Sequence, residues 1–83
     1  MSELPVWWDW PLALTLHAEF RMQERGLGEV QLRTLLEGAD RVYPTGRRDR
    51  WKVLARLRGV RWTVVLEPDE ATRTVLVITV FRT

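Results

Sequence analysis

The spacing of the apolar residues changes once along this chain, near Asp40, and that change limits the folds it can adopt. Up to that point apolar residues recur at helical intervals, as Leu32, Leu35 and Leu36 do on one predicted helix face. Beyond it apolar and polar residues alternate, which is typical of strands with one buried face. Helices followed by a run of strands predict the α+β fold class.

Two helices are expected before residue 40. The first runs from Leu16 to Arg25, because the hydroxyl of Thr15 can cap its first turn and Gly26 can end it in the left-handed conformation. The second runs from Glu29 to Glu37 and ends at Gly38. Three apolar residues are expected on one side of the first helix: Leu16, Phe20 and Leu27.

Four strand candidates follow, over residues 41–43, 50–57, 60–67 and 73–81. The pair Arg58-Gly59 predicts a tight hairpin turn between the second and the third. The last candidate carries apolar residues on both faces, so an interior place in the sheet is expected. Simple alternation puts Thr79 on the same face of that strand as Val75 and Val77.

The length of 83 residues predicts a single domain with one small core. Its expected parts are an extended Trp-rich arm (1–11), a helical hairpin (12–38) and a sheet (40–83). We expect that sheet to have three or four antiparallel strands, with both helices packed on one of its faces.

Composition excludes several kinds of site. The chain has no cysteine and one histidine, which excludes disulfides, thiol nucleophiles, zinc–thiolate sites and histidine-rich metal sites. No metal and no cofactor are therefore expected. The first residues lack the apolar run of a signal peptide, and no stretch of about 18 apolar residues is present to span a membrane. A cytoplasmic protein is expected.

Twelve of the thirteen basic residues are arginine, and Lys52 is the exception. Arginine binds phosphate through two parallel hydrogen bonds and stacks on bases, although a GC-rich genome also replaces lysine with arginine. Alternation along two strand candidates places several basic side chains on one outward face: Arg50, Lys52, Arg56 and Arg61. This face, bordered by Arg25, is either an ordinary solvated strand face or a surface that binds nucleic acid.

His17, Arg21 and Arg25 stand at successive i, i+4 positions of the first predicted helix. Like charges at this spacing cost a few tenths of a kcal/mol each, so such a stripe is locally unfavourable. Its imidazole and guanidinium groups suit contact with a phosphate. The alternative is structural: Arg21 pairs with Glu24 at i+3, and His17 is a half-buried residue without a role in chemistry.

Trp7, Trp8 and Trp10 stand within four positions, followed by Pro11. Three indoles on one arm are too many for a core this small, so some should cover a sheet edge or contact another chain. That chain is a partner protein or a second copy of this one. Stacking on bases is a third use of the same rings.

The chain resembles a small bacterial family, the domain of unknown function 4258, from about Trp8 to Phe81. The similarity rests on His17-Ala18, Arg21-Met22, Arg25-Gly26-Leu27, Glu29-Val30, Leu32, Trp51-Lys52-Val53, Trp62, Val64-Val65, Glu67-Pro68-Asp69 and Val77-Ile78-Thr79-Val80. The resemblance implies the fold of RelE-type and barnase-like toxin nucleases. It implies a metal-independent endoribonuclease, often a toxin held by an antitoxin, with His17, Arg21 and Thr79 at its site. Phe81 stands where close relatives have a tyrosine.

Metal-free RNA cleavage needs a base for the 2′-hydroxyl, an acid for the leaving 5′-oxygen and cations around the phosphorane. His17 can transfer a proton near neutral pH, Arg21 and Arg61 can supply fixed positive charge, and Thr79 can donate a hydrogen bond. No second strong acid or base stands out. Three functions therefore remain open: a ribosome-associated or free ribonuclease toxin, a non-catalytic RNA-binding module, and an oligomeric interaction protein.

Overall fold

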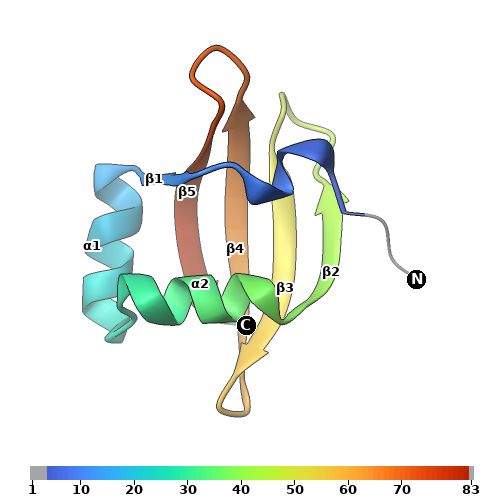
Figure 1. The fold of residues 1–83 in the computed structure, drawn as a ribbon. Coiled ribbons are helices and arrows are strands. Elements are labelled where there is room, and N and C mark those ends of the chain that lie inside the picture. Colours follow the sequence, from blue (N-terminus) through green and yellow to red (C-terminus); the bar gives the residue numbers. More distant parts are fainter. Residues whose placement is uncertain (1–3, 83) are drawn as a thin grey trace.

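A computed structural model describes residues 4–82 of the chain; the first three residues of the predicted arm and residue 83 lie outside this range. The elements are a 3-10 turn η1 (Val6–Asp9), β1 (Leu12–Leu14), α1 (Leu16–Arg25), α2 (Glu29–Glu37), β2 (Ala39–Pro44), β3 (Trp51–Leu57), β4 (Val60–Asp69) and β5 (Thr74–Arg82). Figure 1 shows α2 lying across the sheet and α1 beside β5. Within residues 4–82, no helix is long and apolar enough to cross a membrane.

The fold is α+β, as expected, but its sheet has five strands and is mixed. The strand order is β1-β5-β4-β3-β2, with β1 parallel to β5 and the other pairs antiparallel. The expectation of three or four antiparallel strands is confirmed in part: β2, β3, β4 and β5 form antiparallel pairs, and the parallel strand β1 was not predicted. The three residues of β1 are too few to show an alternating pattern in the sequence. Backbone hydrogen bonds to β5 hold this strand in the sheet. Flanking it, the amide of Val75 donates to the carbonyl of Pro11 at 2.8 Å, and that of Thr15 to the carbonyl of Val77 at 3.2 Å.

Both helices have the predicted bounds. The amide of Ala18 donates to the hydroxyl of Thr15 at 3.0 Å, which caps α1, and Gly26 ends it in the left-handed conformation with φ of 68°. The prediction of the packed face of α1 was wrong for Leu16 and Phe20, which are 84% and 59% exposed. Ala18 and Met22 face the core instead, because Thr15 is bonded to β5 and this contact fixes the rotation of α1.

The core lies between α2, the N-terminal arm and the sheet face that they cover. Buried residues alternate along β3 as the sequence predicts. The alternation is broken in β4 at Thr63, which was expected to point outward and is 2% exposed. The Arg58-Gly59 turn is confirmed by positive φ angles of 53° and 80°. The arm differs from the expected extended segment. Residues Val6–Asp9 form a 3-10 turn, and Trp7 is buried in the core against the ring of Trp51, with ring centroids 5.2 Å apart.

A β-bulge in β5 corrects the expected alternation of that strand. Val65 pairs with Thr79, whereas the next residue of β4 pairs with Val77, so Ile78 is an extra residue without a partner. The bulge places Val80, rather than Thr79, on the buried side with Val77. The interior position of the strand is confirmed, because β5 lies between β1 and β4.

Candidate nucleic-acid interface

One face of the sheet is turned away from α2 and the arm, which both lie on the other side (Figure 1). We call it the open face. Its residues are those that the strand register places on the side opposite the core: Arg41, Tyr43, Lys52, Leu54, Arg56, Arg61, Thr63, Val65, Glu67, Leu76, Thr79 and Phe81. Thr63 is the one member of this set that is buried. Four of the predicted site residues therefore share this face: Lys52, Arg56, Arg61 and Thr79.

The register arranges these side chains in rows that cross the strands. One row is Thr79, Val65, Lys52 and Tyr43; the next is Phe81, Thr63, Leu54 and Arg41; the last is the pair Arg61 and Arg56. Aromatic and basic residues thus share the face with apolar and hydroxyl-bearing ones. Such a mixture of rings and cations is typical of surfaces that bind single-stranded nucleic acid without sequence specificity.

Three arginines surround a hollow of about 280 Å³ at the end of the sheet that carries the Arg58-Gly59 turn. Arg56 lies directly opposite Arg61, a cross-strand pair of like charges that is destabilising by itself. Arg41 joins them from β2, and Asp40 is the one acidic residue of the lining. Within residues 4–82, the ion pairs are Arg21–Glu24 and Arg50–Glu67, so these three guanidinium groups have no carboxylate partner. We call this site the arginine hollow.

Arg41 was missing from the predicted binding residues, although a signal was available. Val42 is apolar between Arg41 and Tyr43, so alternation alone places both neighbours outward on β2. The guanidinium carbon of Arg41 lies 5.1 Å from the centre of the Tyr43 ring, a cation–π contact. This contact holds an arginine and an aromatic ring side by side on the open face.

The helix periodicity places His17 and Arg21 on the flank of α1 that is turned toward the open-face side. Residues are about 100° apart around a helix, and Ala18 and Met22 face the core. Glu19 and Gln23 line a shallow pocket with Glu29, the first residue of α2, so their flank is turned toward the covered side. His17 and Arg21 lie on the opposite flank. His17 is exposed, and Arg21 donates to Glu24 at 3.3 Å.

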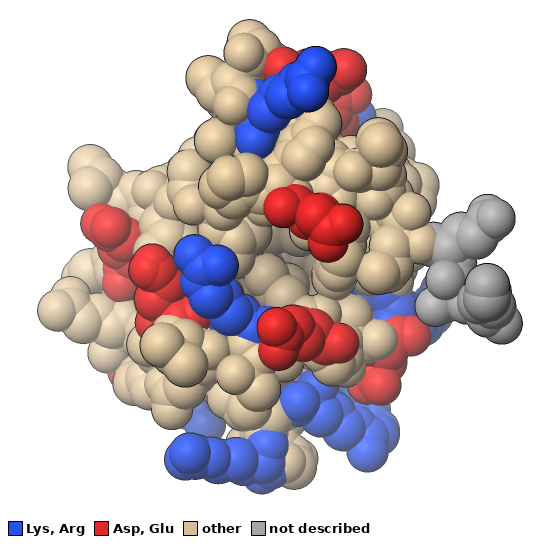
Figure 2. Space-filling model, viewed as in Figure 1, with Lys and Arg blue, Asp and Glu red and all other residues tan. Residues whose placement is uncertain are grey.

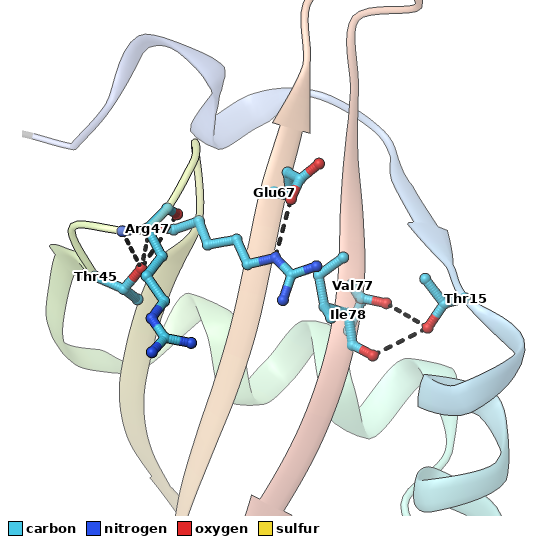
Figure 3. Close-up of polar contacts among 7 residues, drawn as sticks. Thr15, Thr45, Arg47, Glu67, Val77 and Ile78 are labelled. Atoms are coloured by element: carbon cyan, nitrogen blue, oxygen red, sulfur yellow. Dashed lines mark hydrogen bonds and ion pairs between the residues drawn. The ribbon is translucent and has the colours of Figure 1, made fainter.

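Thr15, the N-cap residue of α1, joins the start of this helix to β5, as Figure 3 shows. Its hydroxyl lies 3.1 Å from the carbonyl oxygen of Val77 and 3.0 Å from that of Ile78, and it donates its one proton between them. The bulge turns Thr79, the next residue, onto the open face. The first turn of α1, which carries His17, is thereby fixed beside the segment of β5 that presents Thr79.

Thr15 should therefore contribute more to stability than an ordinary surface threonine. We expect Thr15→Val to lower the free energy of unfolding by about 1–3 kcal/mol, because it removes the helix cap and the hydroxyl hydrogen bonds to the carbonyls of Val77 and Ile78. Urea denaturation measures the change. Thr34→Val is the control, because the Thr34 hydroxyl bonds only within α2, to Val30. Equal small effects of both variants would show that Thr15 does not anchor the bulge.

Three of the predicted site residues have positions or contacts that differ from those expected. Arg50 is engaged by Glu67, with Nε and Oε1 3.0 Å apart, so it is not a free cation. Arg25 is exposed at the C-terminal end of α1. Arg61 lies four residues along β4 from Val65, the partner of Thr79, a separation of about 14 Å along a strand. It belongs to the arginine hollow and cannot act on a phosphate held at Thr79.

The remaining predicted residues are the three tryptophans of the arm. Trp7 is buried, whereas Trp8 and Trp10 are partly buried and pack against the core. Their use as a partner interface stays a prediction. The rings lie on the covered side of the sheet, so they cannot stack on bases bound at the open face.

Comparison with known proteins gives one result. Residues 14–82 match the family described as Domain of unknown function (DUF4258), which covers both helices and the whole sheet apart from its first strand. No curated protein and no solved structure matches the chain.

Proposed function

The chain belongs to the DUF4258 family, and from this premise we propose that it is a small metal-independent endoribonuclease of the RelE-like kind, the toxin of a toxin–antitoxin pair. The observation that supports the proposal most strongly is the arginine hollow. Two arginines placed opposite each other on neighbouring strands are unfavourable without an anion, and a phosphate between them would relieve the repulsion. RNA supplies phosphates at regular intervals.

In the proposed complex, single-stranded RNA crosses the open face from the arginine hollow toward α1. Phosphates contact the cations at one end, and bases stack on Tyr43 and Phe81. Lys52, half-buried in the row of Thr79 and without a carboxylate partner among the described ion pairs, lies between the two ends. The scissile phosphate is held at the far end, where the first turn of α1 meets β5.

The proposed chemistry is attack of the 2′-oxygen on the adjacent phosphorus. The 2′-hydroxyl loses its proton, the bond to the 5′-oxygen breaks, and the products are a cyclic phosphate and a 5′-hydroxyl. His17 accepts the proton of the 2′-hydroxyl and then gives it to the leaving 5′-oxygen. The guanidinium of Arg21 balances the negative charge of the phosphorane, and Thr79 donates to a non-bridging oxygen. Arg21 can turn from Glu24 to the phosphate, because their contact is exposed and of the kind worth less than about 1 kcal/mol.

A second function, binding of RNA without cleavage, has an observation in its favour. A nuclease of this kind uses two groups that transfer protons, and the proposed site has His17 alone in that role. Glu67 is paired with Arg50, and Glu24 is paired with Arg21 in the free protein. His17 would then have to serve both steps in turn. Binding and cleavage must therefore be measured separately.

Binding is tested by the salt dependence of affinity for a single-stranded RNA. Five basic side chains, each in contact with one phosphate, should give a slope of log K against log salt concentration of about −3.5. Arg56→Ala should reduce the slope by about 0.7, because it removes one contact without changing the core. Fluorescence anisotropy over a series of salt concentrations measures both values.

Arg33→Ala is the matched control, because Arg33 is an exposed arginine of α2 on the covered side. It should leave the slope unchanged. Affinity that is independent of salt, or an equal loss in the two variants, would contradict binding of RNA to the open face and leave the interaction-protein hypothesis.

A further inference from the structure

A second hollow, distinct from the open face, lies between the arm and α2. It has a volume of about 250 Å³, and its lining includes Trp7, Trp8 and Trp10 on one side and α2 on the other. Its floor is apolar, formed by Leu66 and Val75. Figure 2 shows a hollow near the middle of this face, with acidic groups on two sides of it and a basic group beside it. We call it the indole pocket.

The indole pocket is held in shape by the fold. In η1 the amide of Trp8 donates to the carbonyl of Pro5 and that of Trp10 to the carbonyl of Trp7, each at 3.0 Å. The Trp7 ring packs edge-on against Trp51 and lies 5.9 Å from the Trp8 ring. Directly after these residues, the carbonyl of Pro11 accepts a hydrogen bond from the amide of Val75, which joins the arm to β5. The pocket wall is thus anchored at both ends.

The charges at the pocket favour a cation. Asp9 comes from η1 and Glu37 from the end of α2, and Arg33 is the one basic residue of the lining. None of the three takes part in an ion pair within residues 4–82. Two carboxylates against one guanidinium leave a net negative charge beside three indoles. Indole is the aromatic ring that attracts cations best.

The pocket is also smaller than the usual range for drug-sized ligands, about 300–1,000 Å³. It has room for one side chain or a compact molecule. An alkyl chain would lie on Leu66, Val75 and the indoles, and a charged head would lie near the carboxylates. We propose that the indole pocket binds an alkylguanidinium or alkylammonium group, either of a free small molecule or of an arginine or lysine side chain of a partner.

Titration of the full chain with N-butylguanidinium, followed by the indole N–H signals in NMR spectra, tests this inference. The signals of Trp7, Trp8 and Trp10 should shift. That of Trp62 should not, because Trp62 lines the arginine hollow, which repels cations. N-butylurea has the same shape without the charge, and it should bind about 3- to 30-fold more weakly, the range that a cation–π contribution covers.

Variants of the two carboxylates that line the indole pocket test the role of their negative charge. Asp9→Asn and Glu37→Gln should each weaken binding about 1.5- to 5-fold, the effect of an exposed ion pair. Glu29→Gln, at the other end of α2, should have no effect. A peptide with a single arginine separates the two sources: binding of the peptide supports a partner side chain, and binding of butylguanidinium alone supports a small molecule. Equal binding of the urea, or no shift with either cation, would overturn the inference.

Discussion

His17→Ala is expected to reduce RNA cleavage by a factor on the order of 10² to 10⁴, the usual contribution of one positioned group that transfers protons. The imidazole of His17 carries the proton transfer in the proposed mechanism, and alanine has no group that can replace it. The wild-type chain should cleave single-stranded RNA in the presence of a chelator and should inhibit growth when expressed without a partner. The variant should do neither at a comparable rate.

Folding and RNA binding serve as controls for this loss. The His17 side chain is exposed and takes part in no hydrogen bond within residues 4–82, so the alanine variant should unfold at the same urea concentration as the wild type. Its affinity for RNA should fall little, because the arginine hollow is intact. Glu19→Ala, two residues away on the flank turned toward α2, should cleave normally. Unchanged cleavage by the His17 variant would leave RNA binding as the function of the open face.

The helices could be predicted from sequence because local residues define their ends. Thr15 accepts from an amide three residues later, and Gly26 adopts a conformation that few other residues tolerate. The alternation of β3 and β4 was also local, and it correctly placed Arg56 and Arg61 on one outward face. These predictions needed no knowledge of which segments meet in space.

The errors concern contacts between segments distant in sequence. The strand β1 exists only because β5 offers it a parallel partner. The bulge at Ile78 depends on the register of two strands, and without it Thr79 would face the core. Arg50 is paired with a carboxylate 17 residues away, which removes it from the free cations of the open face. A sequence pattern shows which side chains share a face of one strand, but not which partner each one finds.

Trp7→Ala is expected to lower the free energy of unfolding by about 3–5 kcal/mol, the usual cost of replacing a buried tryptophan with alanine. The ring packs edge-on against Trp51 and belongs to the core cluster. A domain of this size has a total free energy of unfolding of about 5–15 kcal/mol, so the variant should lose a large part of its stability. Urea denaturation followed by circular dichroism measures the change.

Val6→Ala is the control for Trp7→Ala, because Val6 is the preceding residue and is 88% exposed; its effect should stay within about 0.5 kcal/mol. The arm precedes residue 14, where the family match begins, so the match says nothing of its role. The difference between the two variants decides whether the arm is part of the core. If Trp7→Ala unfolds the protein, the arm is part of the core and cannot detach to wrap a partner. A partner could then contact only the exposed parts of Trp8 and Trp10 at the indole pocket. If both variants are equally stable, the packing of Trp7 contributes little, and the arm is free to serve as the partner interface that the sequence suggests.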